Sequence, residues 1–163
     1  MEPRGWWTSP KPLAAAGELR VPFARMSESQ KTRSLVLILA KDLASRLATP
    51  VFVVDHEGSL LYFNEAAEPV LGVSYAETGE MRGDQWAKLF EPRDHAGNLI
   101  PLQDLPLGIT IFTHRPAHRT LTILAGDGAH RHLAVTAFPL FAHRDEFVGA
   151  VAVFWEQDPE EHQ

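Results

Sequence analysis

Cysteine is absent from the 163-residue sequence. This absence excludes disulfide bonds, thiolate metal sites, iron–sulfur clusters and cysteine nucleophiles, and it leaves the redox compartment open. Long apolar runs are also missing, because the longest, Leu35 to Ala40, falls far short of the roughly 20 residues that a membrane-spanning helix needs. The sequence does not open with a basic and then an apolar segment, as a secretory signal would. We therefore expect a soluble cytoplasmic protein without a membrane partner.

Basic residues are outnumbered by acidic ones. Fifteen lysines and arginines stand against 21 aspartates and glutamates, which gives a formal net charge of −6 and a pI of about 5.7. A broad electrostatic contact with nucleic acid depends on neutralising phosphates, so we expect no direct nucleic-acid partner. With 45 % hydrophobic and 22 % charged residues, the composition is typical of one globular domain with short tails.

The two ends of the sequence are predicted to be tails. Four prolines interrupt residues 1–26, whose apolar positions follow no period, so this segment is predicted to be disordered or to precede a true start at Met26. Residues 158–163 form a short acidic C-terminal tail. Between the tails we expect a flanking helix over residues 27–49 and a folded domain over residues 50–157.

The flanking helix is predicted from its start, its period and its end. Ser27 and Gln30 have the spacing of a capping box, apolar residues recur at intervals of three and four, and the step from Thr49 to proline ends the helix. Two interpretations stay open: the apolar face packs on its own domain, or it pairs with a second chain. In the second case the candidate dimer-interface residues are Leu35, Ile38, Leu39 and Leu43.

Short strands follow the flanking helix. Residues 51–54 and 60–63 are apolar on both faces, which is typical of interior strands that are covered on two sides. Asn64 has the position of a helix N-cap, and Gly72 has that of a C-cap. Further helices are predicted at residues 84–90 and 102–113, and further strands at residues 119–124, 130–138 and 147–155.

Four segments together resemble a PAS domain over residues 43 to 156. They are PVFVVDHEGSLLYFNEAAEPVLG at 50–72, QWAKLFEPRD at 85–94, DLPLGITIF at 104–112 and TAFPLFAHRDEFVGAVAVFWE at 136–156. The resemblance implies an α+β fold, in which a five-stranded antiparallel sheet in the order 2-1-5-4-3 carries helices on one face and an N-terminal flanking helix. That order places the first and last strands at the centre, in agreement with their two-sided apolar pattern.

The resemblance also implies a function, that of a stand-alone PAS-type sensory or signal-transduction module that forms a homodimer. Such a module passes a signal, received by small-molecule or protein binding, to a separate output protein, and any role in transcription is expected to be indirect. The sequence departs from many relatives after its last strand, where Trp155 to Pro159 leads into the acidic tail and not into an output helix. Any output is therefore expected to depend on another chain.

The resemblance places a ligand pocket between the sheet and the helices of residues 64–113. The candidate lining residues are Phe63, Trp86, Phe90, Leu105, Ile109, Phe112 and Leu133. The alternative that stays open is that these large side chains fill the core. The protein would then be a ligand-free interaction scaffold.

The identity of any cofactor stays unknown, but the resemblance allows some classes to be weighed. Photoreceptors of this fold that form a flavin adduct or a cinnamoyl thioester use a cysteine, and both are excluded. Haem needs an axial ligand, yet the helix over residues 102–113 contains no histidine, and His114 and His95 are expected to be solvated. No metal is expected either, although His130 and His132 share a strand face.

Catalytic motifs are missing from the sequence. It contains no serine–histidine–acid arrangement, no glycine-rich phosphate loop and no paired carboxylates at a catalytic spacing. We therefore expect that the protein is not an enzyme. The alternative is a small cone-shaped enzyme of the ketosteroid-isomerase type, which would need a general acid and base in its apolar pocket.

Overall fold

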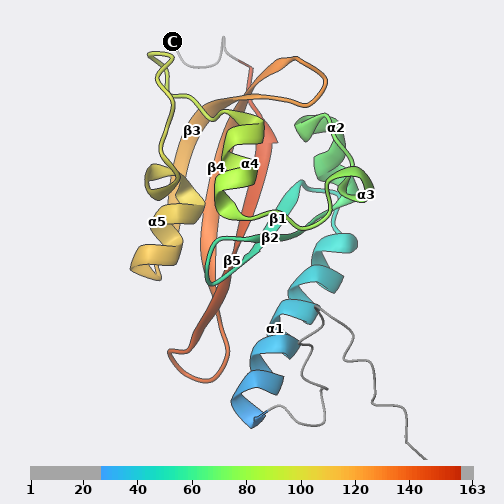
Figure 1. Ribbon diagram of the computed structural model, residues 1–163, viewed down its shortest axis with the longest axis vertical. Coiled ribbons are helices and arrows are strands. Elements are labelled where there is room, and N and C mark those ends of the chain that lie inside the picture. Colours follow the sequence, from blue (N-terminus) through green and yellow to red (C-terminus); the bar gives the residue numbers. More distant parts are fainter. Residues whose placement is uncertain (1–26, 159–163) are drawn as a thin grey trace, which may run out of the picture.

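The computed structural model describes residues 27–158, and the predicted tails lie outside this part of the chain apart from Asp158. Five antiparallel strands form one sheet in the order β2-β1-β5-β4-β3 (Figure 1), which confirms the predicted order. The strands are β1 (Val51–Asp55), β2 (Leu60–Phe63), β3 (Ala117–Leu124), β4 (His130–Phe141) and β5 (Phe147–Glu156). The helices are α1 (Glu28–Ser45), η2 (Glu65–Ala67), α2 (Glu68–Leu71), α3 (Tyr75–Thr78), α4 (Gly83–Phe90), η3 (Leu102–Asp104) and α5 (Pro106–Thr113).

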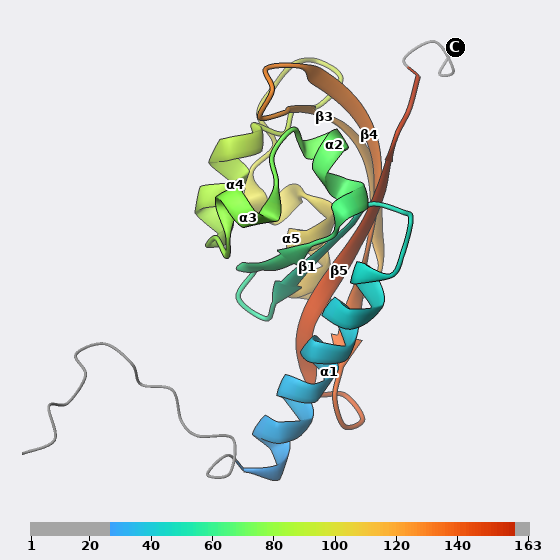
Figure 2. The same ribbon diagram turned by 90° about the vertical axis from the view of Figure 1, so that its right-hand side faces the viewer.

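The two faces of the sheet are covered differently (Figure 2). The helices between β2 and β3 lie on one face, the inner face, whereas α1 lies against the other, the outer face. Alternate residues of β1 belong to separate hydrophobic clusters: Phe52 and Val54 pack in the inner core, and Val51 and Val53 pack with Ala44 of α1. The predicted burial of β1 on both faces is therefore confirmed. The same prediction is wrong for residues 60–63, because β2 lies at the edge of the sheet and its Leu61 and Tyr62 are half-buried.

The flanking helix starts as predicted. Ser27 Oγ accepts the N–H of Gln30 at 3.1 Å, and Gln30 Oε1 accepts the N–H of Ser27 at 3.0 Å, which completes the capping box. Of the residues of α1, all of which the structure describes, Ala44 alone is buried. The helix is therefore held most firmly near its C-terminal end.

Asn64 fixes this end of α1 to the sheet. Its side chain is buried, and Oδ1 accepts the N–H of Val51 at 2.9 Å and that of Ala67 at 3.1 Å. Its Nδ2 donates to the carbonyl oxygens of Ala44 at 2.9 Å, Leu47 at 3.3 Å and Thr49 at 2.8 Å. The predicted N-cap is confirmed, and the same side chain also joins the end of α1 to the start of β1.

The predicted helix over residues 102–113 is wrong in its register. Leu105 is extended (φ −74°, ψ 152°) between η3 and α5, because the residue before Pro106 avoids the helical region and the proline starts a new helix. The new start rotates the side chains that follow, so α5 buries Pro106, Leu107 and Thr110. Phe112, which we expected to face inward, is 88 % exposed.

We expect Asn64→Ala to lower the free energy of unfolding by about 3 kcal/mol or more, because it removes the five hydrogen bonds of a buried side chain and leaves the buried N–H of Val51 without its acceptor. Asn64→Asp should also be destabilising, since a carboxylate would face the carbonyl oxygens that Nδ2 now contacts. Urea unfolding measures both losses. Asn98→Ala, at an exposed asparagine, is the control and should change stability by less than about 0.5 kcal/mol. Equal effects at both positions would contradict the role assigned to Asn64.

Candidate functional site

An apolar cavity of about 80 Å³ lies between the inner face of the sheet and the helices. Side chains of β1, β3, β4 and β5 form its floor, and α2, α4, the loop after α4 and the start of α5 supply the rest of its wall. The lining residues are Phe52, Leu71, Trp86, Phe90, Pro92, Leu105, Pro106, Leu107, Leu121, Ile123, Leu133, Val135 and Phe154. Its position is the one that the sequence predicted for a ligand pocket.

The wall of the cavity offers no free polar side chain among these lining residues. Trp86 carries the one polar side-chain atom, and its Nε1 already donates to the carbonyl oxygen of Gly58 at 2.9 Å. The Trp86 ring also packs edge-on against Phe52, with 5.3 Å between ring centroids and 70° between planes. A molecule inside the cavity would therefore meet dispersion contacts and no hydrogen-bonding side chain.

The predicted pocket residues divide into three groups. Trp86, Phe90, Leu105 and Leu133 line the cavity. Phe63 is buried in the same core, where it stacks on Phe52 at 6.2 Å and 7°, but it does not line the cavity.

Ile109 and Phe112 lie outside the cavity wall, because the restart of the helix at Pro106 turns them away from it. Sequence reasoning missed Phe52 and Phe154 as lining residues. The two-residue period of a strand, which places alternate side chains on the same face of the sheet, was the signal that could have found them.

The histidines within residues 27–158 are not among the residues that line the cavity. His114 ends α5 and stacks on Phe147, with 4.2 Å between ring centroids and 12° between planes. His95 contacts the Thr120 hydroxyl at 3.1 Å, and His132 Nδ1 contacts that of Thr122 at 2.9 Å. Within residues 27–158, no group of three or more histidine, aspartate or glutamate side chains is arranged to hold a metal ion.

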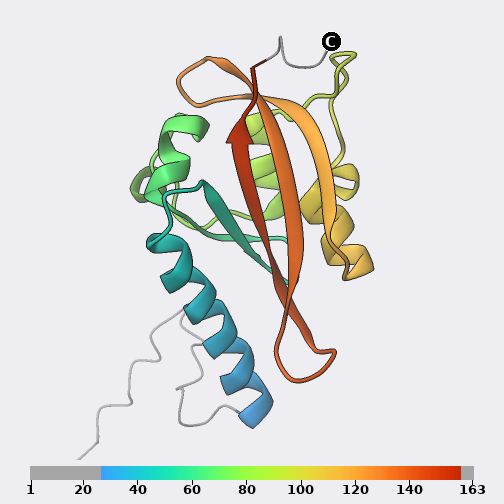
Figure 3. The same ribbon diagram turned by 180° about the vertical axis from the view of Figure 1, so that it is seen from behind.

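On the outer face, α1 lies along the sheet (Figure 3). Its side chains and those of the sheet enclose a second apolar feature, a groove of about 230 Å³. We call it the outer groove. Its lining residues are Val36, Leu39, Ala40, Leu43, Ala44, Leu47, Val51, Phe138, Leu140, Val151 and Val153. The four candidate interface residues of α1 are between 51 % and 61 % exposed, and two of them, Leu39 and Leu43, line the groove.

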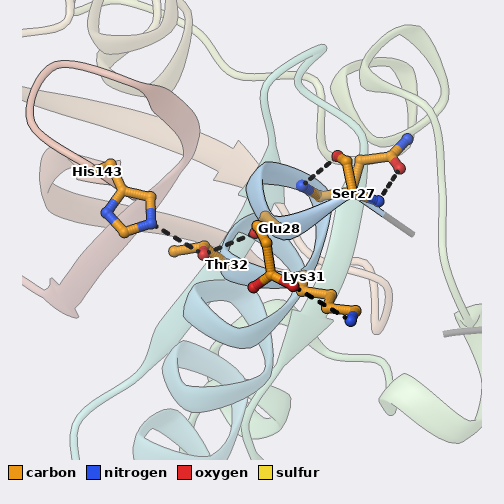
Figure 4. A network of polar contacts seen from close by, with 6 residues as sticks. Ser27, Glu28, Lys31, Thr32 and His143 are labelled. Carbon is orange, nitrogen blue, oxygen red and sulfur yellow. Dashed lines mark hydrogen bonds and ion pairs between the residues drawn. The ribbon is translucent and has the colours of Figure 1, made fainter. Parts of the chain in front are cut away.

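Polar contacts surround the N-terminal end of α1 (Figure 4). Lys31 and Glu28 form an ion pair at 3.4 Å, and the Thr32 hydroxyl lies 3.1 Å from Nε2 of His143 in the turn between β4 and β5. Glu146 of the same turn contacts Ser29 and Arg33, and these two partners hold the pKa of its carboxyl below its usual value. Exposed charged and polar groups therefore hold this end of α1, whereas the buried side chains of Ala44 and Asn64 hold the other.

The chain belongs to the PAS family, because residues 40–155 match the family described as PAS fold. Its structure is similar to a LOV protein of Rhodobacter sphaeroides, with a TM-score of 0.60 at 11 % identity over 82 % of this chain and 71 % of that one. It is also similar to the LOV domain of the blue-light activated histidine kinase EL346 of Erythrobacter litoralis. The TM-score is 0.52 at 19 % identity, and the match covers 69 % of this chain and 98 % of that one. A third similar structure is the PAS domain of BvgS from Bordetella pertussis. Its TM-score is 0.50 at 17 % sequence identity, and the match covers 77 % of this chain and 89 % of that one.

These likenesses establish the fold, and the family is generally one of sensory and signal-transduction modules. A comparison with curated protein sequences finds no match. In the part of the chain that the structure describes, no helix is both long and apolar enough to cross a membrane.

Two phenylalanines of the predicted pocket test the cavity wall. Phe90→Ala should lower the free energy of unfolding by about 3–5 kcal/mol, because it removes a buried ring from the wall. Phe112→Ala should change it by less than about 0.5 kcal/mol, since that ring is exposed. Thermal and urea unfolding measure both. A large loss at Phe112 would contradict the register of α5.

Proposed function

We propose that the chain is a sensory and signal-transduction module that forms a homodimer and passes its signal to a separate partner protein. The observation that carries the proposal is the outer groove, together with the exposed apolar residues beside it on α1. Large apolar patches on a monomer are unfavourable in water and mark interaction surfaces. The membership of the chain in the PAS family supports the sensory part of the proposal.

A second copy of the chain is the occupant that this surface fits best. In a two-fold dimer, the same patch on each chain contacts its equivalent, so one helix can both offer and receive apolar side chains. Leu39 and Leu43 lie in the groove, whereas Leu35 and Ile38 project beside it. Such an arrangement lets each α1 cover the groove and the exposed leucines of the other chain.

The input to the module is limited by the size and chemistry of the cavity. Ligand sites commonly measure about 300–1,000 Å³, and the cavity is about 80 Å³. It favours a small uncharged molecule without hydrogen-bonding groups over a flavin or a haem. The same observation favours a second candidate function, that of a ligand-free interaction scaffold whose core is filled.

An enzyme of the ketosteroid-isomerase type has less support. Such an enzyme needs a general acid and base at its pocket, and none of the described lining residues of the cavity is a carboxylate or a histidine. We therefore propose that the module is not catalytic.

The dimer is tested by a charge placed in the outer groove. We expect the wild-type chain to sediment as a dimer at micromolar concentration. Leu43→Glu should weaken pairing by about 100-fold or more, because two like charges would be desolvated across the two-fold axis. Leu99→Glu is the matched control, since Leu99 is similarly exposed but lies far from α1 in the loop before η3, and it should leave the dimer intact. A wild-type monomer would contradict the proposal.

The nature of the input is tested by native mass spectrometry and an absorption spectrum of freshly purified protein. For a sensor of a small apolar molecule, we expect a dimer without a flavin or haem band, and a mass increment that Leu133→Phe abolishes by filling the cavity. A bare dimer supports the scaffold. A flavin or haem band would contradict the limit that we derive from the size of the cavity.

A further inference from the structure

The turn between β4 and β5, residues 142–146, lies beside the N-terminal end of α1 in all three views (Figures 1, 2 and 3). Its Glu146 carboxylate accepts a hydrogen bond from Ser29 Oγ at 2.8 Å and forms an ion pair with Arg33. Because these partners are more than 100 residues apart in the sequence, the contact joins two separate parts of the fold.

The contact between Thr32 and His143 has a defined direction. The Thr32 hydroxyl donates its single proton to the carbonyl oxygen of Glu28 at 2.9 Å. It must therefore accept a hydrogen bond from Nε2–H of His143, at 3.1 Å (Figure 4). His143 can donate this bond as the Nε2–H tautomer or as the cation, so the contact does not depend on the charge of the ring.

The two ends of α1 are held with different strength. At the C-terminal end, Ala44 is buried and the Asn64 amide donates to three carbonyl oxygens. At the N-terminal end, the contacts of Ser29, Thr32 and Arg33 with the turn are exposed, and exposed ion pairs contribute little because water and salt screen them. The N-terminal end of α1 therefore separates from the rest of the fold more easily than the C-terminal end.

The same turn is also linked to α5. His114, in the left-handed conformation (φ 56°) at the end of α5, stacks on Phe147 at the start of β5. It also lies edge-on to Phe141 at the end of β4, with 6.4 Å between ring centroids. The other end of α5 lines the cavity through Pro106 and Leu107. The two strand ends that carry the turn thus contact the helix that borders the cavity.

We propose that the β4–β5 turn is a latch that couples the position of α5 to the N-terminal half of α1. A displacement of α5 moves the His114 ring against Phe141 and Phe147, shifts the turn, and breaks or restores the contacts of Glu146 and His143 with α1. The proposal deepens the proposed function, on which it rests for its consequence, because α1 is the helix that we propose to pair.

Amide hydrogen exchange within the intact chain tests the latch. Glu146→Ala removes the carboxylate, and His114→Asn removes the ring while keeping a residue type that tolerates the left-handed conformation. We expect both variants to accelerate exchange over residues 31–36 by about three- to fivefold, as the loss of a weak surface contact implies. The effect of His114→Asn is decisive, because α5 and α1 lie on opposite faces of the sheet and the printed ring contacts of His114 are with Phe141 and Phe147 at the strand ends.

Matched controls separate the latch from a general loss of stability. Asp42→Ala breaks an exposed ion pair with Arg46 near the other end of α1, and His56→Asn removes an exposed ring from a different turn. Neither should change exchange over residues 31–36. Exchange over residues 150–154, in the buried part of β5, should stay slow in every variant that keeps the fold.

The outcomes decide each part of the proposal. Unchanged exchange over residues 31–36 in Glu146→Ala overturns the latch, and unchanged exchange in His114→Asn overturns its coupling to α5. If His114→Asn loosens β5 as well, Phe147→Leu replaces it as the test, since leucine keeps an apolar side chain and removes the ring stack. Because residues 31–36 include Leu35, a candidate interface residue, the exchange of both variants is also measured in the Leu43→Glu background, in which the proposed dimer is broken. The same acceleration in that background shows that the latch acts inside one chain, whatever the sedimentation test finds for the dimer.

Discussion

The buried amide of Asn64 is the interaction on which the rest of the structure depends. It holds the end of α1, the start of β1 and the turn that opens the inner helices, through five hydrogen bonds from one side chain. An amide suits this position because it offers an acceptor on one side and two donor hydrogens on the other. Without it, the buried N–H of Val51 would lose its acceptor, and the end of α1 would lose its bonds to the sheet.

From this junction the sheet can be buried on both faces. In β1, Phe52 and Val54 pack in the inner core, whereas Val51 and Val53 pack against α1 on the outer face. β5 pairs with β1 along the whole length of β1. Gly149 permits this close packing, because a Cβ there would lie 2.4 Å from the Val54 carbonyl oxygen and 3.2 Å from a methyl carbon of Leu37. The outer face is only partly covered, however, and this leaves the apolar groove beside α1.

Local patterns were enough to predict the individual strands, the capping box and the N-cap, since each depends on neighbours in the sequence. The order of the strands in the sheet came from the resemblance to PAS domains, because strand pairing joins distant parts of the chain. They failed at Leu105, although the rule for residues before proline applies there as it does at Thr49. The apolar run from 105 to 112 suggested a single helix, and its face was therefore assigned with the wrong register. The tertiary bonds of Asn64 and the contacts of Glu146 lay beyond the sequence, because polar side chains at these positions have many exposed alternatives.

The positions of the two apolar features constrain how a signal could travel. The cavity and the outer groove lie on opposite faces of the sheet. A structural change at the cavity can therefore reach α1 in two ways: by a movement of the strands between them, or through contacts at the edge of the sheet. The central strands are a poor path, because residues such as Val53 and Ala150 are fully buried and close-packed layers resist small displacements. The β4–β5 turn extends beyond the packed layers and contacts α1 through Glu146, and the strand ends that carry the turn contact His114 at the end of α5. We therefore expect a displacement of the side chains that line the cavity to pass along α5 and through this turn to α1.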